Sequence, residues 1–77
     1  MYYVYILECK DGSLYTGTTN DLKRRFREHK NKIGGHYTAS HGAKQIVYKE
    51  KFKTKGLALR REAEIKRYRR NKKIKLI

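Results

Sequence analysis

The sequence predicts an α+β fold in which a small three-stranded antiparallel sheet is flanked by helices, in the order β-β-α-β-α. Two short runs rich in tyrosine and β-branched residues, 2–7 and 14–18, are separated by a glycine turn, which is typical of a hairpin. A basic segment with helical periodicity follows, and a third strand-like run at 45–52 precedes a second helical segment. From 77 residues we expect one domain, 1–77, with a thin hydrophobic core.

The turn of the hairpin determines how its two strands pair. Residues 10–12 are expected to form a three-residue loop whose glycine takes a positive φ. The register that this loop favours places Leu7 opposite Tyr15 and Tyr5 opposite Gly17. Tyr5 and Tyr15 would then be diagonal neighbours on one face of the sheet, whereas a slip of one residue would separate them.

The basic segment after the hairpin is expected to form a helix that runs to about Lys32 and ends at the glycine pair Gly34-Gly35. Three consecutive polar residues could cap its start and place an acid near its positive end: Thr19, Asn20 or Asp21. The spacing i, i+4, i+7 and i+11 predicts its inward-facing stripe: Leu22, Phe26, His29 and Ile33.

The second half of the chain is expected to add the third strand and a second helix. Residues 36–43 are mostly small and polar and are expected to form a loop, and residues 45–52 form the strand. Thr54 can cap a helix that continues to about Tyr68. Residues 71–77 are expected to add a short turn or helix anchored by apolar side chains.

The charge of the chain indicates a polyanionic partner. It carries 21 Lys plus Arg against 7 Asp plus Glu, a formal net charge of +14, and nucleic acid is the usual partner for such a balance. The alternative is a generally sticky or ribosome-bound basic protein. No long apolar stretch or lipidation motif indicates a membrane. Cys9 is the only cysteine, so no internal disulfide can form and we expect a cytoplasmic protein.

Two residues of the first helix are candidates for catalysis. His29 lies on the apolar stripe, and Arg25, one turn earlier, borders that stripe and points the same way. The plainer interpretation makes His29 a core histidine and Arg25 one more surface charge. Their combination with two tyrosines on a hairpin favours a site that binds a phosphate group.

The two acids of the second helix, Glu62 and Glu64, differ in their neighbours. Glu64 has Arg60 at i−4 and Arg67 at i+3, so a surface ion pair explains it. Glu62 is framed by apolar residues and should face the sheet, either as a partner of Arg25 or as the ligand of a hard cation. A single carboxylate suits Mg²⁺, which keeps several of its water ligands.

The seven tyrosines call for separate interpretations. Most tyrosines of a small sheet pack with their hydroxyls at the surface, and we interpret three of them in this way: Tyr2, Tyr3 and Tyr48. Tyr37 and Tyr68 remain open. Tyr15 differs because small residues follow it, and Gly17 among them permits another group to approach the strand closely.

These residues resemble the GIY-YIG nuclease family. Tyr3-Val4-Tyr5 stands where that family has Gly-Ile-Tyr, and Tyr15-Thr16-Gly17 stands where it has Tyr-Ile-Gly. The order and spacing of the triplets and of three later residues carry the resemblance: Arg25, His29 and Glu62. It covers essentially the whole chain and is closest to small stand-alone bacterial members, which are related to the catalytic domains of excision-repair incision subunits and homing endonucleases.

The resemblance implies a metal-dependent endonuclease that hydrolyses phosphodiester bonds in DNA, with a role in repair as one option. Glu62 would hold one divalent ion, Mg²⁺ or Mn²⁺, and Tyr15 would be the general base. Arg25 would stabilise the developing charge, while Tyr5 and His29 would orient groups or assist proton transfer. The sequence departs from the family pattern at three positions: Tyr3 replaces the first glycine, Thr18 stands where some members carry lysine, and only Asn71 can match a late asparagine.

A basic surface is expected to bind phosphates without reading bases. We expect it to consist of Lys23, Arg24, Lys30, Arg60, Arg61, Lys66, Arg67, Arg69 and Arg70. DNA is favoured over RNA, a partner protein could supply targeting, and the protein would be a monomer or a transient dimer. The alternative is a nucleic-acid-binding module of the same fold with little or no catalytic activity, or a translation-associated RNA-binding protein.

Overall fold

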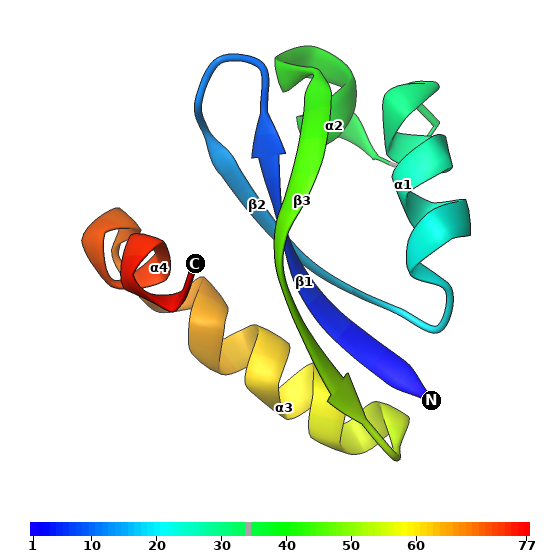
Figure 1. Ribbon diagram of the computed structural model, residues 1–77, viewed down its shortest axis with the longest axis vertical. Coiled ribbons are helices and arrows are strands. Elements are labelled where there is room, and N and C mark those ends of the chain that lie inside the picture. Colours follow the sequence, from blue (N-terminus) through cyan, green and yellow to red (C-terminus); the bar gives the residue numbers. More distant parts are fainter. Residues whose placement is uncertain (34) are drawn as a thin grey trace.

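A three-stranded antiparallel sheet of order β2-β1-β3 forms the middle of the computed structural model, which describes residues 1–33 and 35–77 (Figure 1). Its strands are β1 (Tyr2–Cys9), β2 (Leu14–Thr19) and β3 (Ala43–Phe52). The helices are α1 (Leu22–Lys30), α2 (His36–His41), α3 (Lys55–Lys66) and α4 (Arg70–Leu76). The predicted α+β class and antiparallel sheet are confirmed.

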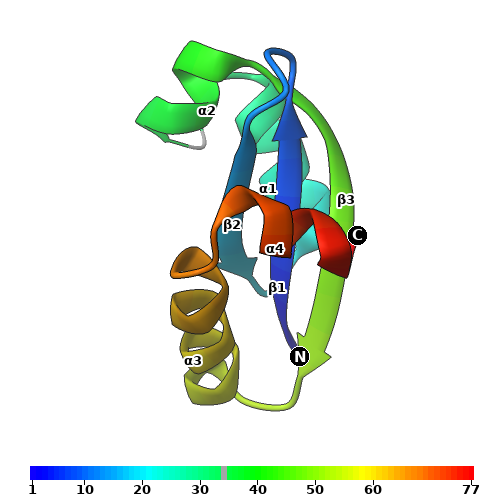
Figure 2. The ribbon, with the colours of Figure 1, turned by 90° about the vertical axis from the view of Figure 1, so that its left-hand side faces the viewer.

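The helices lie on both sides of the sheet. Figure 1 shows α1 on one face and α3 with α4 on the opposite face, while α2 lies at the end of the sheet near the β1–β2 turn. Figure 2 shows α3 running beside β2, with α4 crossing in front of the strands. At the free edge of β2, residues of α1 and α3 line one cavity although the two helices lie on opposite faces of the sheet.

Alternate residues of the central strand β1 supply two hydrophobic cores. Val4 and Ile6 pack with buried residues of α3, and Tyr5 and Leu7 pack against partly buried residues of α1. All four side chains are at most 1% exposed. Because both faces are covered, this strand is a nearly continuous apolar run, as a doubly buried strand requires.

The predicted hairpin register is confirmed. Leu7 pairs with Tyr15 and Tyr5 pairs with Gly17, so Tyr5 and Tyr15 lie on the same face. Gly12 takes φ +86° in the turn, as expected for the residue that closes a three-residue loop.

The first helix begins as expected but is shorter than the apolar stripe predicts. Asp21 caps it by accepting a hydrogen bond of 3.0 Å from the backbone N–H of Arg24. The helix ends at Lys30, and Lys32 takes φ 64°. The prediction that Ile33 faces inward is wrong, because the chain leaves the helix before it and leaves the side chain 72% exposed. The predicted stop at Gly34 lies outside the described residues.

The prediction of a loop at 36–43 is wrong, since residues 36–41 form the helix α2. Glycines with positive φ stand on both sides of it, Gly35 at 136° and Gly42 at 77°. The backbone N–H of Gly42 closes the helix by donating to the carbonyl of Thr38 at 2.9 Å. Glycine adopts positive φ without steric cost, so the chain can turn sharply before and after this short helix.

The later elements differ from the prediction only at their ends. The third strand starts at Ala43, two residues early, because two register irregularities in its pairing with β1 accommodate extra residues. Thr54 caps α3 as predicted and accepts a hydrogen bond of 3.2 Å from the backbone N–H of Leu57. The helix ends at Lys66, and α4 provides the short terminal helix. None of the helices in the described part of the chain has the length and apolar character needed to cross a membrane.

Candidate active site

A cavity of about 490 Å³ runs along the free edge of β2 and joins the helices of the two faces. Arg25 and Glu28 reach it from α1, and Glu62 reaches it from α3. Thr18 of β2 lies between them in the lining. Three charged residues from elements far apart in the sequence therefore share one small solvent-filled space.

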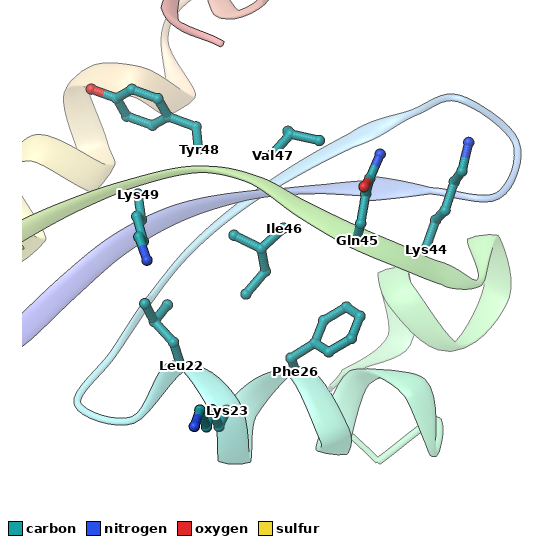
Figure 3. A pocket seen from close by; sticks show the side chains of 9 residues that line it. All are labelled: Leu22, Lys23, Phe26, Lys44, Gln45, Ile46, Val47, Tyr48 and Lys49. Atoms are coloured by element: carbon teal, nitrogen blue, oxygen red, sulfur yellow. The ribbon is translucent and has the colours of Figure 1, made fainter.

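A larger cavity of about 630 Å³ lies on the opposite side of the sheet, between α1 and β3. Figure 3 shows Leu22 and Phe26 of α1 facing Ile46 of β3 across it, with lysines around the opening. No acid or histidine lines this cavity among the described residues. It offers no carboxylate to hold a metal, whereas the cavity beside β2 combines carboxylates with an arginine and is therefore the candidate site.

A buried hydrogen-bond chain links the hairpin to both α1 and α2. The hydroxyl of Tyr5 lies 2.8 Å from Nε2 of His29, and Nδ1 of His29 lies 2.7 Å from Oγ1 of Thr38. Each of the three residues is only 1% exposed. The histidine that the apolar stripe predicted to face inward is thus buried and has a partner on both ring nitrogens.

Burial keeps Tyr5 and His29 in their neutral forms. It raises the pKa of Tyr5 to about 12, although a hydrogen bond with Arg25 acts in the lowering direction. The pKa of His29 is lowered, first by burial and then by the nearby charge of Arg25. Tyr5 is therefore a proton carrier rather than a ready base at neutral pH.

Tyr15 lies next to this chain but outside it. Its ring centroid is 5.3 Å from that of His29 and 6.4 Å from that of Tyr5. Tyr37 of α2 lies on its other side, at 5.6 Å, and stacks on His41 at 4.2 Å. No hydrogen bond to the Tyr15 hydroxyl is formed within residues 1–33 and 35–77, so this oxygen is available to an added molecule. Tyr5 and Tyr15 are not among the residues that line the cavity beside β2.

Arg25 is held at the cavity by partners on two sides. Its Nη1 donates to Glu28 at 3.0 Å, and the guanidinium lies close enough to the Tyr5 hydroxyl to affect the pKa of both groups. Burial alone would lower the pKa of Arg25, but the interactions with Glu28 and Tyr5 outweigh it and raise the pKa. The cation is therefore positioned beside Tyr5 and stays charged at any physiological pH.

The structure separates the two acids of α3. Glu62 lines the cavity, keeps 17% of its side chain exposed and pairs with Lys66 at 3.3 Å. Glu64 faces outward with 48% exposed and pairs with Arg61. The expected partners of Glu64 were Arg60 and Arg67, and the ion pair with Arg61 at i−3 replaces them.

The cavity offers oxygen donors suited to a hard divalent cation. Glu62 and Glu28 supply carboxylates, and the buried Oγ1 of Thr18 has no hydrogen-bond partner. Within the described residues, no three acid, histidine or cysteine side chains cluster closely enough to form a complete metal site. This donor set fits Mg²⁺ or Mn²⁺, which bind through one or two carboxylates and complete their shell with water and phosphate.

The predicted nucleic-acid-binding residues border several different hollows of the surface. Arg24 lines the candidate site, Lys23 borders the α1–β3 cavity, and Lys30 lies over the Phe26 ring. A separate hollow of about 520 Å³ near the start of α4 is lined by basic residues and Asn71, including two of the predicted set: Arg67 and Arg69.

Two of the predicted binding residues already have acidic partners. Arg61 is bonded to Glu50 at 2.9 Å and to Glu64, and Lys66 pairs with Glu62. Arg60 and Arg70 are exposed. No local pattern indicates that Arg61 differs from Arg60 in this way, because its partner Glu50 lies on β3.

Three residues of the site were not predicted: Thr18, Glu28 and Thr38. Glu28 follows Arg25 by three positions, a helical spacing that predicts their ion pair. Thr38 was placed in a loop, and no local pattern indicates that it meets His29. Only the tertiary fold brings these two residues together.

The sequence model of the GIY-YIG catalytic domain matches residues 1–75, and the chain therefore belongs to the GIY-YIG family. Its sequence relatives are small proteins designated UPF0213. One from Staphylococcus saprophyticus is 51% identical over 76 residues, which cover 99% of this chain and 93% of the relative. One from Haloquadratum walsbyi is 52% identical over 75 residues, which cover 97% of this chain and 84% of the relative.

A solved structure agrees with the fold. The solution NMR structure of the UPF0213 protein BH0048 from Bacillus halodurans is 47% identical in sequence and superposes with a TM-score of 0.62. The match covers 99% of this chain and 82% of that one. Membership of this family gives the chain a nuclease-type catalytic domain, for which nucleic acid is the substrate class.

Proposed function

We propose that this protein is a divalent-metal-dependent endonuclease that hydrolyses phosphodiester bonds in DNA. The observation that supports this best is the cavity beside β2, where Arg25 from one face of the sheet and Glu62 from the other line the same space. A phosphodiester needs a cation for its charged oxygens and a carboxylate to hold a metal, and this cavity offers both.

Tyr15 is the residue that we assign as general base. Its hydroxyl has no partner within the described residues, so a water molecule can hydrogen-bond to it, as proton abstraction requires. Tyr5 is a poorer choice because its pKa is about 12 and its hydroxyl is already shared between His29 and Arg25. Tyr5 and His29 then serve to place Arg25 and to accept or return a proton.

Arg25 stabilises the charge that develops on the phosphoryl oxygens. Guanidinium groups bind phosphate oxygens through parallel N–H donors, and a donor fixed before the reaction needs little reorganisation. The partners of Arg25 on two sides hold it in this way.

Glu62 would hold the metal, with Glu28 and the unpaired Thr18 hydroxyl beside it in the cavity. When bound, a divalent ion polarises a phosphoryl oxygen and stabilises the leaving oxygen. Lys66, whose side chain is 53% exposed, would then exchange its pairing with Glu62 for solvent.

The basic surface supports binding to the DNA backbone without reading of bases. Because cations that bind phosphates carry no sequence information, we propose low sequence specificity. A partner protein could supply targeting, and cleavage of both strands would favour a transient dimer over the monomer. A repair-related role in the cytoplasm is the biological setting that this chemistry would suit.

The test is cleavage of supercoiled plasmid and of labelled branched DNA with Mg²⁺ or Mn²⁺. Wild type is compared with Glu62→Gln and with the matched control Glu64→Gln, which makes the same chemical change on the exposed side of α3. We expect Glu62→Gln to lose cleavage and Glu64→Gln to keep it. The reverse result would show that Glu62 is not the metal ligand. Tight DNA binding without cleavage by wild type would favour the alternative function, a nucleic-acid-binding module.

A further inference from the structure

The cavity between α1 and β3 has no part in the proposed chemistry. It encloses about 630 Å³, within the range of about 300–1,000 Å³ that ligand sites occupy. Its apolar floor consists of Leu22, Phe26 and Ile46, which face one another across it (Figure 3). The sheet order β2-β1-β3 places it at the opposite edge of the sheet from the candidate active site, so an occupant here leaves that site open.

This cavity follows the outer edge of β3. Six consecutive residues of the strand line it, 44–49, although successive side chains of a strand point to opposite faces. Figure 3 shows Ile46 and Lys49 directed toward α1 and Tyr48 directed away from it. A cavity on one face would be lined by alternate residues, so this one also reaches the backbone. Within the described residues β3 pairs only with β1, which leaves its outer N–H and C=O groups open to another strand.

Cations stand at both ends of the apolar floor. Lys23 and Lys49 lie at the end near Leu22, and Lys44 lies at the other end (Figure 3). Lys44 already has an ion pair with Glu8 at 3.8 Å, whereas Lys23 and Lys49 form none within the described residues. An occupant that carries carboxylates on either side of an apolar side chain therefore matches the charges and the floor of the cavity.

The lysines of β3 argue against a second copy of this chain as the occupant. The strand carries three of them, Lys44, Lys49 and Lys51, and each copy has a formal net charge of +14. Lysines on a sheet edge, and an irregularity such as the one that leaves Val47 without a partner on β1, keep the edge from pairing with itself. An acidic strand turns the repulsion into attraction. DNA has the charge for these lysines but no peptide groups to pair with the strand edge.

We propose that the outer edge of β3 is the docking site of an extended acidic segment of a partner protein. The segment adds a strand to the sheet and places an apolar side chain between Leu22, Phe26 and Ile46. In this kind of recognition the main-chain hydrogen bonds give affinity and the cavity selects the side chain. The inference does not rest on the proposed function, because the docking site and the candidate active site lie at different edges of the sheet.

The test is an NMR titration of ¹⁵N-labelled protein with short synthetic peptides that carry leucine, isoleucine or phenylalanine between glutamates. We expect the amide signals of residues 22–26 and 44–49 to shift together. Lysine in place of the glutamates should abolish binding. Serine in place of the apolar residue should weaken binding about tenfold, because the burial of that side chain is lost. Methylation of the peptide nitrogens that pair with β3 should prevent binding, because it removes the donors of the added strand.

Two variants of the protein separate the cavity from the overall charge. Lys49→Glu reverses a charge at the cavity, and Lys75→Glu makes the same change on α4, which lies on the opposite face of the sheet from α1 (Figure 1). Both lysines are exposed, so both variants should fold. We expect Lys49→Glu to weaken peptide binding about fivefold and Lys75→Glu to change it by less than about twofold.

Three outcomes overturn the proposal: no peptide shifts the signals of the cavity, the two variants weaken binding equally, or the methylated peptides bind as well as the others. Single-stranded DNA that shifts the same signals while the peptides do not would assign the cavity to nucleic acid. Dimers of wild type in sedimentation equilibrium that Lys49→Glu dissociates would assign the edge of β3 to a second copy of the chain.

Discussion

The hydroxyl of Tyr5 occupies the space that a side chain on Gly17 would need. A Cβ atom built on Gly17 would lie 2.5 Å from the hydroxyl oxygen of Tyr5 and 3.1 Å from the ring of Tyr15. Tyr5 on β1 pairs directly with Gly17 on β2. Because Gly17 has no side chain, the Tyr5 ring can lie across the neighbouring strand. Glycine in this strand thus makes room for the hydroxyl that meets His29.

We expect Gly17→Ala to disturb both the fold and the site. The methyl group would displace the buried ring of Tyr5, and such overpacking costs about 1–3 kcal/mol of unfolding free energy. The hydrogen bond of 2.8 Å between Tyr5 and His29 would be lost with it. Urea unfolding and the NMR signals of His29 measure the two effects.

Gly56→Ala is the matched control for that substitution. A Cβ at Gly56, in the first turn of α3, would meet nothing within 4 Å. Alanine favours helix over glycine, so we expect the unfolding free energy to rise by about 0.5–1 kcal/mol. Equal effects of the two substitutions would show that the close approach of Tyr5 to Gly17 does not matter.

Tyr15→Phe should abolish DNA cleavage and leave the fold intact. The substitution removes only a hydroxyl that has no partner in the described part of the chain, so the unfolding free energy should change by less than about 0.5 kcal/mol. Loss of a general base lowers the rate by about 10²–10⁴-fold. Steady-state cleavage and thermal unfolding check both expectations.

Tyr3→Phe is the control for Tyr15→Phe, because Tyr3 lies on the same sheet but, among the described residues, has no ring contact with Tyr5 or His29, whereas Tyr15 contacts both. It should keep wild-type cleavage. Cleavage retained by Tyr15→Phe would remove Tyr15 from the mechanism and mean that another group or the bulk solvent accepts the proton of the attacking water.

Arg60 and Arg61 are adjacent in sequence but should respond differently to substitution. Arg61 keeps 23% of its side chain exposed and donates to Glu50 on β3, whereas Arg60 is exposed on α3. We expect Arg61→Ala to lower the unfolding free energy by about 1–3 kcal/mol, because Glu50 would lose its cationic partner and keep only the hydrogen bond from Tyr48. Arg60→Ala should change stability by less than about 0.5 kcal/mol.

DNA binding should show the opposite pattern. A free surface cation that contacts a phosphate contributes about one unit to the slope of log affinity against log salt concentration, so Arg60→Ala should reduce that slope. Arg61→Ala should leave the slope unchanged. A drop in the slope for Arg61→Ala alone would mean that DNA displaces Glu50 and recruits this arginine.

Local patterns predicted the parts of the fold that depend on neighbouring residues. The loop length set the register of Tyr5 and Tyr15, and the caps Asp21 and Thr54 marked the helix starts. His29 was expected to face inward from its spacing alone and is 1% exposed. Glu62 was separated from Glu64 by its apolar neighbours, and the cavity agrees with that separation.

Features that depend on contacts between distant segments were not predicted. The helix α2 has only six residues, too few for a clear periodic pattern, and Thr38 within it is held by a hydrogen bond to His29. The predicted apolar stripe of the first helix extended to Ile33, which is in fact exposed, because periodicity does not show where the backbone leaves the helix. The cavity itself requires the edge of β2 to meet α1 and α3, which no local pattern records.

The raised pKa of Tyr5 predicts a loss of stability at high pH. In the unfolded chain a tyrosine ionises near pKa 10, and in the folded protein Tyr5 ionises at about 12. Between these values the folded state binds more protons than the unfolded state, so the unfolding free energy falls as the pH rises. The contribution of Tyr5 is fully present below pH 10 and is lost through pH 12, with a total of about 2–3 kcal/mol.

We expect Tyr5→Phe to flatten this part of the stability profile in urea unfolding, and ultraviolet titration of wild type should show one tyrosine that ionises after the exposed ones. A Tyr5→Phe profile as steep as that of wild type would mean that the alkaline loss arises elsewhere, with Tyr48, whose pKa is also raised by burial, as the next residue to substitute.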